Sequence, residues 1–274
     1  MAIIPDLYLN SVVAIGITTV GDRIVWIGTG FFAGRSVDSE KPNEVRPFLI
    51  TNKHVFANHK QVVIRMRKSD SEDLQVVNVN LRDNNGQVLY NTHNNKAIDI
   101  AVLPLSVLFI QANNLDFQCF NIDENAMSSG ELRLHGVDEG SIIYMLGFPM
   151  GLVNEKSNIP LCRMGCISRM SETQIREQYN ILVDIQNFPG NSGSPIILRP
   201  EVMSITVTRN LTKSVLIGIV HSYIPYQEEL INKQTNQVVM LKSENSGIAN
   251  IHPVEFIREI IDEFIIDNNS YTHE

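Results

Sequence analysis

The sequence of 274 residues is poor in cysteine, and this shortage limits the kinds of protein it can encode. Its three cysteines, Cys119, Cys162 and Cys166, are an odd number in a chain of this length and do not look like a disulfide framework. Cys162 and Cys166 are four positions apart, so the two-residue gap typical of zinc knuckles is absent. We therefore expect free thiols in a reducing compartment and no zinc site; no cofactor is predicted for the chain.

The chain also has few basic residues and no long hydrophobic run. Its 22 lysines and arginines stand against 30 aspartates and glutamates, and the resulting net charge of -8 argues against a nucleic-acid partner. No apolar run approaches the roughly 20 residues that cross a bilayer, so no membrane association is expected. The first residues lack the basic region and apolar core of a signal peptide. The simplest interpretation is a cytoplasmic, bacterial protein.

Short apolar runs rich in valine and isoleucine, separated by Gly, Asn, Asp and Pro, predict an all-β protein. The runs lie at 12–17, 24–27, 48–51, 62–66, 100–103, 142–146, 165–167, 181–185, 195–198, 215–220 and 238–241. A polar stretch at 121–130 divides them into two groups. We therefore expect one domain over 1–274 that contains two β-barrels, at about 8–122 and about 130–250.

The last part of the chain has a different period. Apolar residues from Val254 to Ile265 recur at steps of three and four, which predicts a C-terminal amphipathic helix over 253–266. The longer polar stretches are predicted to be surface loops or hairpin ends. They lie at 35–46, 67–73, 82–96 and 227–236.

A serine between glycines, in the segment GNSGSP at 190–195, predicts a hydroxyl exposed in a tight turn. Such a hydroxyl needs a base within about 2.6–3.2 Å, and the base needs a third group to orient it. His54 follows an apolar run and Asp99 precedes one, so both are expected at strand ends that converge on a cleft. The order His54, Asp99, Ser192 is used by one lineage of catalytic triads.

These motifs resemble those of the trypsin-like serine peptidases, in particular the bacterial glutamyl endopeptidases and HtrA-type proteases. TNKHV at 51–55 and GNSGSP are similar to the glutamyl endopeptidase motifs, IDIAVL at 98–103 to the Asp motif, and GFPMGL at 147–152 to the HtrA pattern. The resemblance covers most of the chain and implies a double six-stranded β-barrel of the trypsin-like type with a C-terminal α-helix. It also implies that Ser192 is the nucleophile, His54 the general base and then acid, and Asp99 the group that fixes the imidazole tautomer. The amides of Gly190 and Ser192 would form the oxyanion hole.

The resemblance further marks six substrate-binding residues, Gln186, Asn187, His221, Ser222, Tyr223 and Gly247. Gln186 stands where trypsins carry the acidic residue that selects Lys or Arg, and His221 lies one place beyond the histidine of glutamyl endopeptidases. Neither specificity is therefore expected. Asn191 replaces the Asp that pairs with a new N-terminus in secreted members, which indicates another means of control, such as a regulatory protein partner or a loop rearrangement.

The resulting prediction is a serine endopeptidase that hydrolyses peptide bonds of a protein or peptide substrate through an acyl-enzyme. Partner control in a bacterial stress or defence system is a further hypothesis. Two alternatives stay open: a protease-fold module that binds peptides or proteins without turnover, and a hydrolase of small esters or amides. Four further histidines have no ligand spacing and are predicted to be surface or capping residues. They are His59, His93, His135 and His252.

Overall fold

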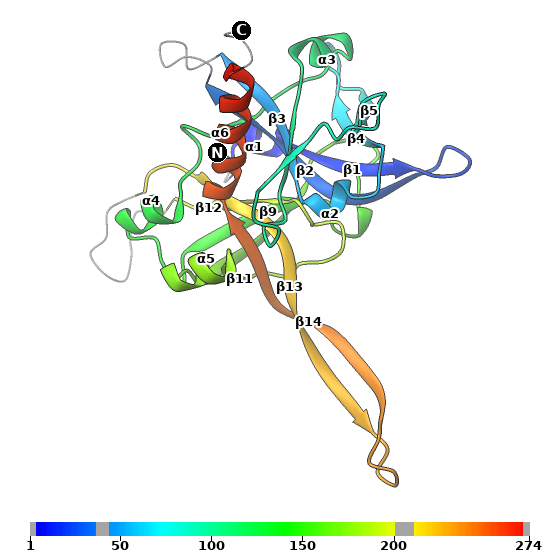
Figure 1. Ribbon diagram of the computed structural model, residues 1–274, viewed down its shortest axis with the longest axis vertical. Coiled ribbons are helices and arrows are strands. Elements are labelled where there is room, and N and C mark those ends of the chain that lie inside the picture. The colour runs from blue at the N-terminus through cyan, green and yellow to red at the C-terminus, as the bar shows by residue number, and fades with distance from the viewer. Residues whose placement is uncertain (1–3, 37–43, 201–210, 271–274) are drawn as a thin grey trace.

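The protein is described by a computed structural model over residues 4–36, 44–200 and 211–270, with side chains as far as 266. Two β units lie side by side, and a C-terminal helix packs against them (Figure 1). Among the described residues, no helix is long and apolar enough to span a bilayer.

The first unit is an eight-stranded sheet in the order β5-β4-β1-β2-β3-β7-β6, with β8 paired to β2. Its strands are β1 (Val12–Thr18), β2 (Ile24–Ser36), β3 (Val45–Thr51), β4 (Gln61–Arg67), β5 (Leu74–Asn80), β6 (Asn91–Thr92), β7 (Ala101–Pro104) and β8 (Phe120–Asn121). The second unit is a closed barrel in the order β10-β11-β14-β13-β12-β9. Its strands are β9 (Ile142–Gly147), β10 (Leu161–Arg169), β11 (Ile181–Asp184), β12 (Pro195–Leu198), β13 (Val215–Ile231) and β14 (Val238–Pro253).

The helices are short except for the last. They are α1 (Asp6–Asn10), α2 (Lys53–Phe56), α3 (Val107–Ala112), α4 (Ser129–Leu134), the 3-10 turn η1 (Pro149–Gly151), α5 (Glu172–Gln178) and α6 (Val254–Ser270). The stripe predicted for α6 is buried at Val254, Ile257, Ile260 and Ile261. Arg258, on another face, donates to the carbonyls of Ile122 and Ala126 and so fixes the helix to the connection between the two units.

The predicted all-β fold with two β units and a C-terminal helix is confirmed. The first unit differs from the six strands expected for it. Six strands of four or more residues are joined by β6 and β8, which are two residues each, and the hydrogen-bonded order has two ends. β6 lies in polar loop sequence and β8 is only two residues long, so neither has the apolar run that predicts a strand.

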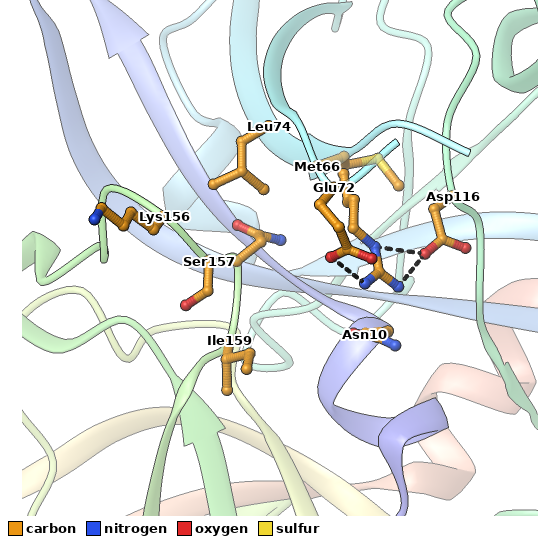
Figure 2. A pocket seen from close by; sticks show the side chains of 10 residues that line it. Asn10, Met66, Glu72, Leu74, Asp116, Lys156, Ser157 and Ile159 are labelled. Atoms are coloured by element: carbon orange, nitrogen blue, oxygen red, sulfur yellow. Dashed lines mark hydrogen bonds and ion pairs between the residues drawn. The ribbon is translucent and has the colours of Figure 1, made fainter. Parts of the chain in front are cut away.

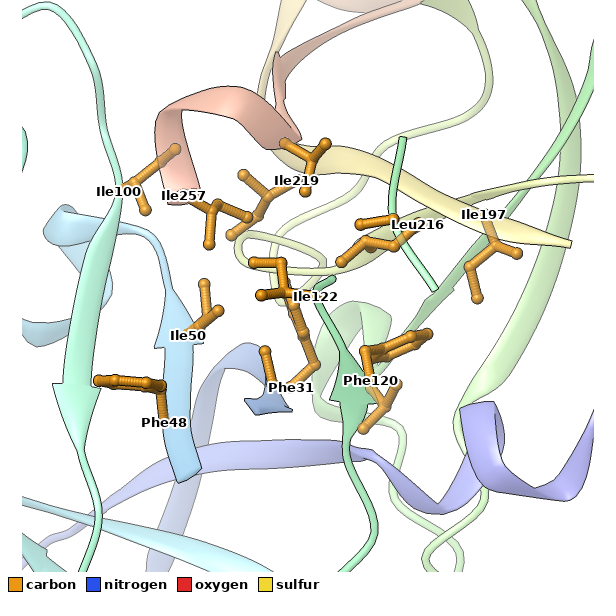
Figure 3. Packing of buried hydrophobic residues seen from close by; sticks show 14 of the residues in the cluster. Phe31, Phe48, Ile50, Ile100, Phe120, Ile122, Ile197, Leu216, Ile219 and Ile257 are labelled. Carbon is orange, nitrogen blue, oxygen red and sulfur yellow. The ribbon is translucent and has the colours of Figure 1, made fainter. Parts of the chain in front are cut away.

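One hydrophobic core joins the two units (Figure 3). Phe31, Phe48 and Ile50 reach it from the first sheet, Leu216 and Ile219 from the barrel, and Ile257 from α6. Each unit also has a core of its own. The shared core fixes the position of the first sheet relative to the barrel, and the predicted triad residues lie on segments from both.

The polar stretches have different outcomes. Residues 67–73 connect β4 to β5, and 82–96 is mostly loop but carries β6, while most of 35–46 lies outside the described residues. In 227–236, the first five residues belong to β13, and only the end of the hairpin is turn. Beyond the barrel, β13 and β14 continue as a two-stranded ribbon that projects from the molecule (Figure 1).

Candidate active site

His54 and Asp99 lie in direct contact, as their order in the sequence predicted. His54 is in α2, directly after β3, and Asp99 precedes β7, which pairs with β3. Asp99 Oδ2 accepts from His54 Nδ1 at 2.5 Å, and Asp99 Oδ1 accepts from the backbone N–H of His54 at 3.0 Å. Because the Nδ1–H of His54 is donated to the carboxylate, its Nε2 atom carries no proton and is left as the base.

The Asp99 carboxylate is kept ionised by this pairing. Burial alone would raise the pKa of Asp99, whose side chain is 22% exposed, but the hydrogen bonds and charge of His54 outweigh burial and lower it. A stable carboxylate favours the imidazolium that forms when His54 takes a proton.

The backbone of Asp99 is held from two sides by buried residues. The Nδ2 amide of Asn52, which precedes α2, donates to the Asp99 carbonyl at 2.7 Å. The Asp99 N–H donates to Nε2 of His252 at 3.0 Å, and Nδ1 of His252 donates in turn to the Tyr179 carbonyl at 2.6 Å. His252 is therefore a neutral imidazole with its proton on Nδ1.

The prediction that His252 is a surface or capping histidine is wrong. Its side chain is 1% exposed and its ring stacks on that of His221, with centroids 3.9 Å apart and planes 7° apart. Burial lowers the pKa of both, and that of His221 falls to about 3. Sequence reasoning missed His252 because nothing local marks a contact with a residue 153 positions away.

The Ser192 turn is fixed by hydrogen bonds to both β units. The Ser192 carbonyl accepts from the Thr29 N–H at 2.9 Å, on β2. Thr29 Oγ1 donates to the Gly190 carbonyl at 2.7 Å. On the other side, the Gly193 N–H donates to the Val220 carbonyl at 3.1 Å, on β13. Gly193 has a φ of +89° and an added Cβ would collide with the Thr29 backbone, so only glycine fits.

The amides predicted for the oxyanion hole have no acceptor within residues 4–36, 44–200 and 211–270. Gly190 and Ser192 donate no backbone hydrogen bond to any described residue. Ser192 itself is half-buried, and no hydrogen bond among the described residues joins its Oγ to His54. Asn191 is 1% exposed, and neither polar atom of its side chain has a partner in the same part of the chain. The turn therefore offers two free donors beside the serine.

Residues 28–201 match the trypsin-like peptidase domain family, which is more than half of the chain. The chain belongs to this family. The match concerns the family as a whole and does not distinguish its glutamyl endopeptidase and HtrA-type branches. No curated protein matches the sequence.

Two solved structures are similar to this trypsin-like peptidase domain. The apo protease domain of MamO from Magnetospirillum magneticum is 12% identical with a TM-score of 0.46, over 92% of this chain and 96% of that one. The VesB protease of Vibrio cholerae is 12% identical with a TM-score of 0.52, over 95% of this chain and 65% of that one, so this chain spans less than two thirds of VesB. At this identity the likeness to VesB concerns the fold alone.

The predicted substrate-binding residues lie in two groups on the barrel. Gln186 is exposed and lies beside Gly247, whose carbonyl accepts from the Ile185 N–H at 2.8 Å. Asn187 is buried, and the side chain of Asn245 hydrogen-bonds to both its carbonyl and the Gly247 N–H. His221, Ser222 and Tyr223 follow one another on β13. The ring of His221 stacks on His252, while Tyr223 is 40% exposed.

The cysteines and one further pocket lie outside these groups. Cys119 and Cys166 are half-buried, Cys162 is exposed, and all three are free. Among the described residues, no three His, Cys, Asp or Glu side chains gather as metal ligands would. A pocket of about 120 Å³ is lined by residues that include Glu72 and Asp116 (Figure 2). Arg67 also lines it and pairs with both carboxylates. These charges satisfy one another, and no triad residue lines the pocket.

Proposed function

We propose that this chain is a serine endopeptidase that hydrolyses peptide bonds of a protein substrate through an acyl-enzyme. The observation that carries the proposal is the doubly hydrogen-bonded pair of His54 and Asp99, which leaves Nε2 of His54 as the base. Membership of the trypsin-like peptidase family supports the same chemistry.

In the proposed reaction, Ser192 Oγ attacks the scissile carbonyl carbon while Nε2 of His54 takes the hydroxyl proton. The developing oxyanion accepts from the free N–H groups of Gly190 and Ser192. His54 then gives its proton to the leaving amine, and the acyl group stays on Ser192. Water, activated by His54, releases the acid and restores the serine. Asp99 remains ionised throughout and stabilises the imidazolium.

A second candidate is a module that binds peptides without turnover. It is favoured by one observation, that no hydrogen bond among the described residues joins Ser192 Oγ to His54. Catalytic hydrogen bonds in substrate-free proteases are often long and tighten when substrate binds. The free amides and the ordered Asp99 therefore support the enzyme over the binding module.

Control by a regulatory protein partner is part of the proposal. Activation by a new N-terminus needs a carboxylate before the nucleophile, and Asn191 there carries no charge. Its neutral, buried side chain supports a different means of activation. Our candidate is a partner protein that orders the Ser192 turn.

The proposal is tested by cleavage of an unfolded protein and of a peptide library, followed by mass spectrometry. Ser192→Ala should lower the rate by about three orders of magnitude or more. Ser194→Ala is the matched control, because it removes a hydroxyl with no partner among the described residues from the same motif. Peptide binding without cleavage by the wild type would favour the binding module. Turnover of small esters with rejection of every polypeptide would favour the ester hydrolase.

A further inference from the structure

The β13–β14 ribbon leaves one edge of β13 open along its whole projecting part (Figure 1). Inside the barrel, β13 lies between β12 and β14, and the pairing with β12 ends at Pro195 and Ile219. From Ser222 to Ile231, β14 is the one described strand that pairs with β13. Ten residues at about 3.3 Å each give an unpaired edge of about 30 Å.

This open edge begins beside the proposed nucleophile. Gly193, directly after Ser192, donates to the Val220 carbonyl at 3.1 Å, and the Val220 N–H donates to the Ser194 carbonyl at 3.0 Å. Position 221 is therefore the first on β13 that is free of the Ser192 turn. A chain lying along the edge from there outward has one end at Ser192.

The projecting part of the ribbon exposes much apolar surface and pairs with no other described strand. The nine large apolar side chains that are at least 40% exposed are Tyr223, Ile224, Tyr226, Leu230, Ile231, Val238, Val239, Met240 and Leu241. An isolated two-stranded hairpin is marginally stable in water, and a third strand adds both hydrogen bonds and apolar contacts. The ribbon is thus suited to receiving another strand.

The resemblance to trypsin-like peptidases already implies that a substrate backbone pairs with residues 221–223. We propose that this edge continues through residues 224–231 of the ribbon, so that the polypeptide on the N-terminal side of the scissile bond adds as a long antiparallel strand. The inference rests on the proposed function and deepens it. Because β13 runs away from Ser192, an antiparallel partner runs toward it and delivers its carboxyl end to the nucleophile. The substrate is therefore an unfolded or extended polypeptide with about ten residues before the cleavage site.

The charge of the edge adds a preference. The only charged residues between 222 and 231 are Glu228 and Glu229, which lie on opposite faces of the strand. A Lys or Arg in the incoming strand opposite either residue would form a favourable cross-strand pair. Pro225 has no N–H, so it can donate no backbone hydrogen bond to the incoming strand.

The base of the ribbon also contacts the predicted substrate pocket. Asn245 on β14 donates from Nδ2 to the Asn187 carbonyl at 2.5 Å, and the same side chain accepts from the Gly247 N–H at 2.9 Å. A strand bound on the ribbon would therefore lie on the element that positions Asn187 and Gly247.

The test compares peptides with three or ten residues before the same cleavage site. For the wild type, we expect kcat/KM to be at least about tenfold higher for the long peptide, because several backbone hydrogen bonds are added. In a variant that replaces residues 227–243 by an Asn-Gly turn between Tyr226 and Glu244, this advantage should shrink to what residues 224–226 still contribute, while cleavage of the short peptide persists. N-methylation of alternate residues of the long peptide should remove the advantage without any change to the protein.

Charge reversal supplies a second variant that keeps the ribbon. Glu228→Lys with Glu229→Lys should change the preference from a Lys to a Glu in the facing peptide positions by about two- to fivefold. Equal cleavage of long and short peptides by the wild type would overturn the inference. A second result would also overturn it: the wild type is a dimer, shortening the ribbon dissociates the dimer, and the long peptide has no advantage over the short one. The open edge would then bind a second copy of the chain rather than substrate.

Binding separates this inference from the proposed function. Fluorescence anisotropy with the Ser192→Ala variant measures peptide affinity without turnover, and we expect the long peptide to bind at least about tenfold more tightly. If that difference is found but the wild type never cleaves, the binding edge stands and the enzyme assignment fails. If the wild type cleaves but neither binding nor cleavage depends on peptide length, the edge fails and the enzyme assignment stands.

Discussion

Replacing His252 by phenylalanine tests whether this buried ring holds Asp99 in place. Phenylalanine keeps an aromatic ring that can stack on His221 and contact Phe256. It removes the acceptor for the Asp99 N–H and the donor to the Tyr179 carbonyl. Two buried backbone groups lose their partners at about 1–3 kcal/mol each, so we expect a loss of about 2–6 kcal/mol in the free energy of unfolding.

The same substitution should change the pH dependence of stability. Burial lowers the pKa of His252 and brings that of His221 to about 3, whereas both are near 6.5 in the unfolded chain. The unfolded state therefore takes up protons first as the pH falls, and stability decreases below about pH 6.5. Each such histidine contributes up to about 1.4 kcal/mol per pH unit, continuing toward pH 3 for His221. His252→Phe removes one of these groups, so its stability should fall less steeply with acid.

Urea unfolding at pH 7, 6 and 5, followed by the fluorescence of the single tryptophan, Trp26, measures both effects. His59→Phe is the control, because the ring of His59 makes no hydrogen bond to a described residue. It should change stability by less than about 0.5 kcal/mol. A loss below about 1 kcal/mol for His252→Phe, with an unchanged pH slope, would refute the role assigned to His252.

Three further substitutions probe the site. Asn191→Asp places an unpaired carboxylate in a site that is 1% exposed. The melting temperature should therefore fall at pH 7 and recover as acid protonates the group. An unchanged melting temperature would mean that a cation, such as a new N-terminus, pairs with the carboxylate. Gly193→Ala should prevent stable folding because its Cβ meets the Thr29 backbone. Gly86→Ala, with open space around it, should lower the free energy of unfolding by about 1 kcal/mol, measured by thermal denaturation. Equal effects of the two substitutions would contradict the packing of the turn. Asp99→Asn should lower kcat by about four orders of magnitude in steady-state assays with little change in KM, and a loss below tenfold would argue against its role.

The sequence pattern predicted much of the fold because most strands bury an apolar run. β1 and β12 correspond closely to their runs, and α6 buries the predicted stripe. The projecting half of β13 carries no such signal: both of its faces are exposed, so no burial imposes a period of two, and pairing with β14 alone holds it.

The candidate site was predictable to the extent that motifs carry it. His54 and Asp99 stand in such motifs, and the structure brings them into contact. Asn52 and His252, which hold the backbone of Asp99, are ordinary polar residues in the sequence. Their roles depend on segments that meet only in the folded protein, so they follow from tertiary structure rather than from local pattern.

Labelling by a fluorophosphonate tests the central claim, that Ser192 is a nucleophile activated by His54 and Asp99. The native protein should take up one phosphonyl group, which peptide mapping by mass spectrometry places on Ser192. Ser192→Ala and urea-unfolded protein should remain unlabelled, because an isolated serine hydroxyl is a poor nucleophile. A native protein that takes up no label with substrate-like peptides and candidate partners present, or that carries it on another residue, would contradict the account.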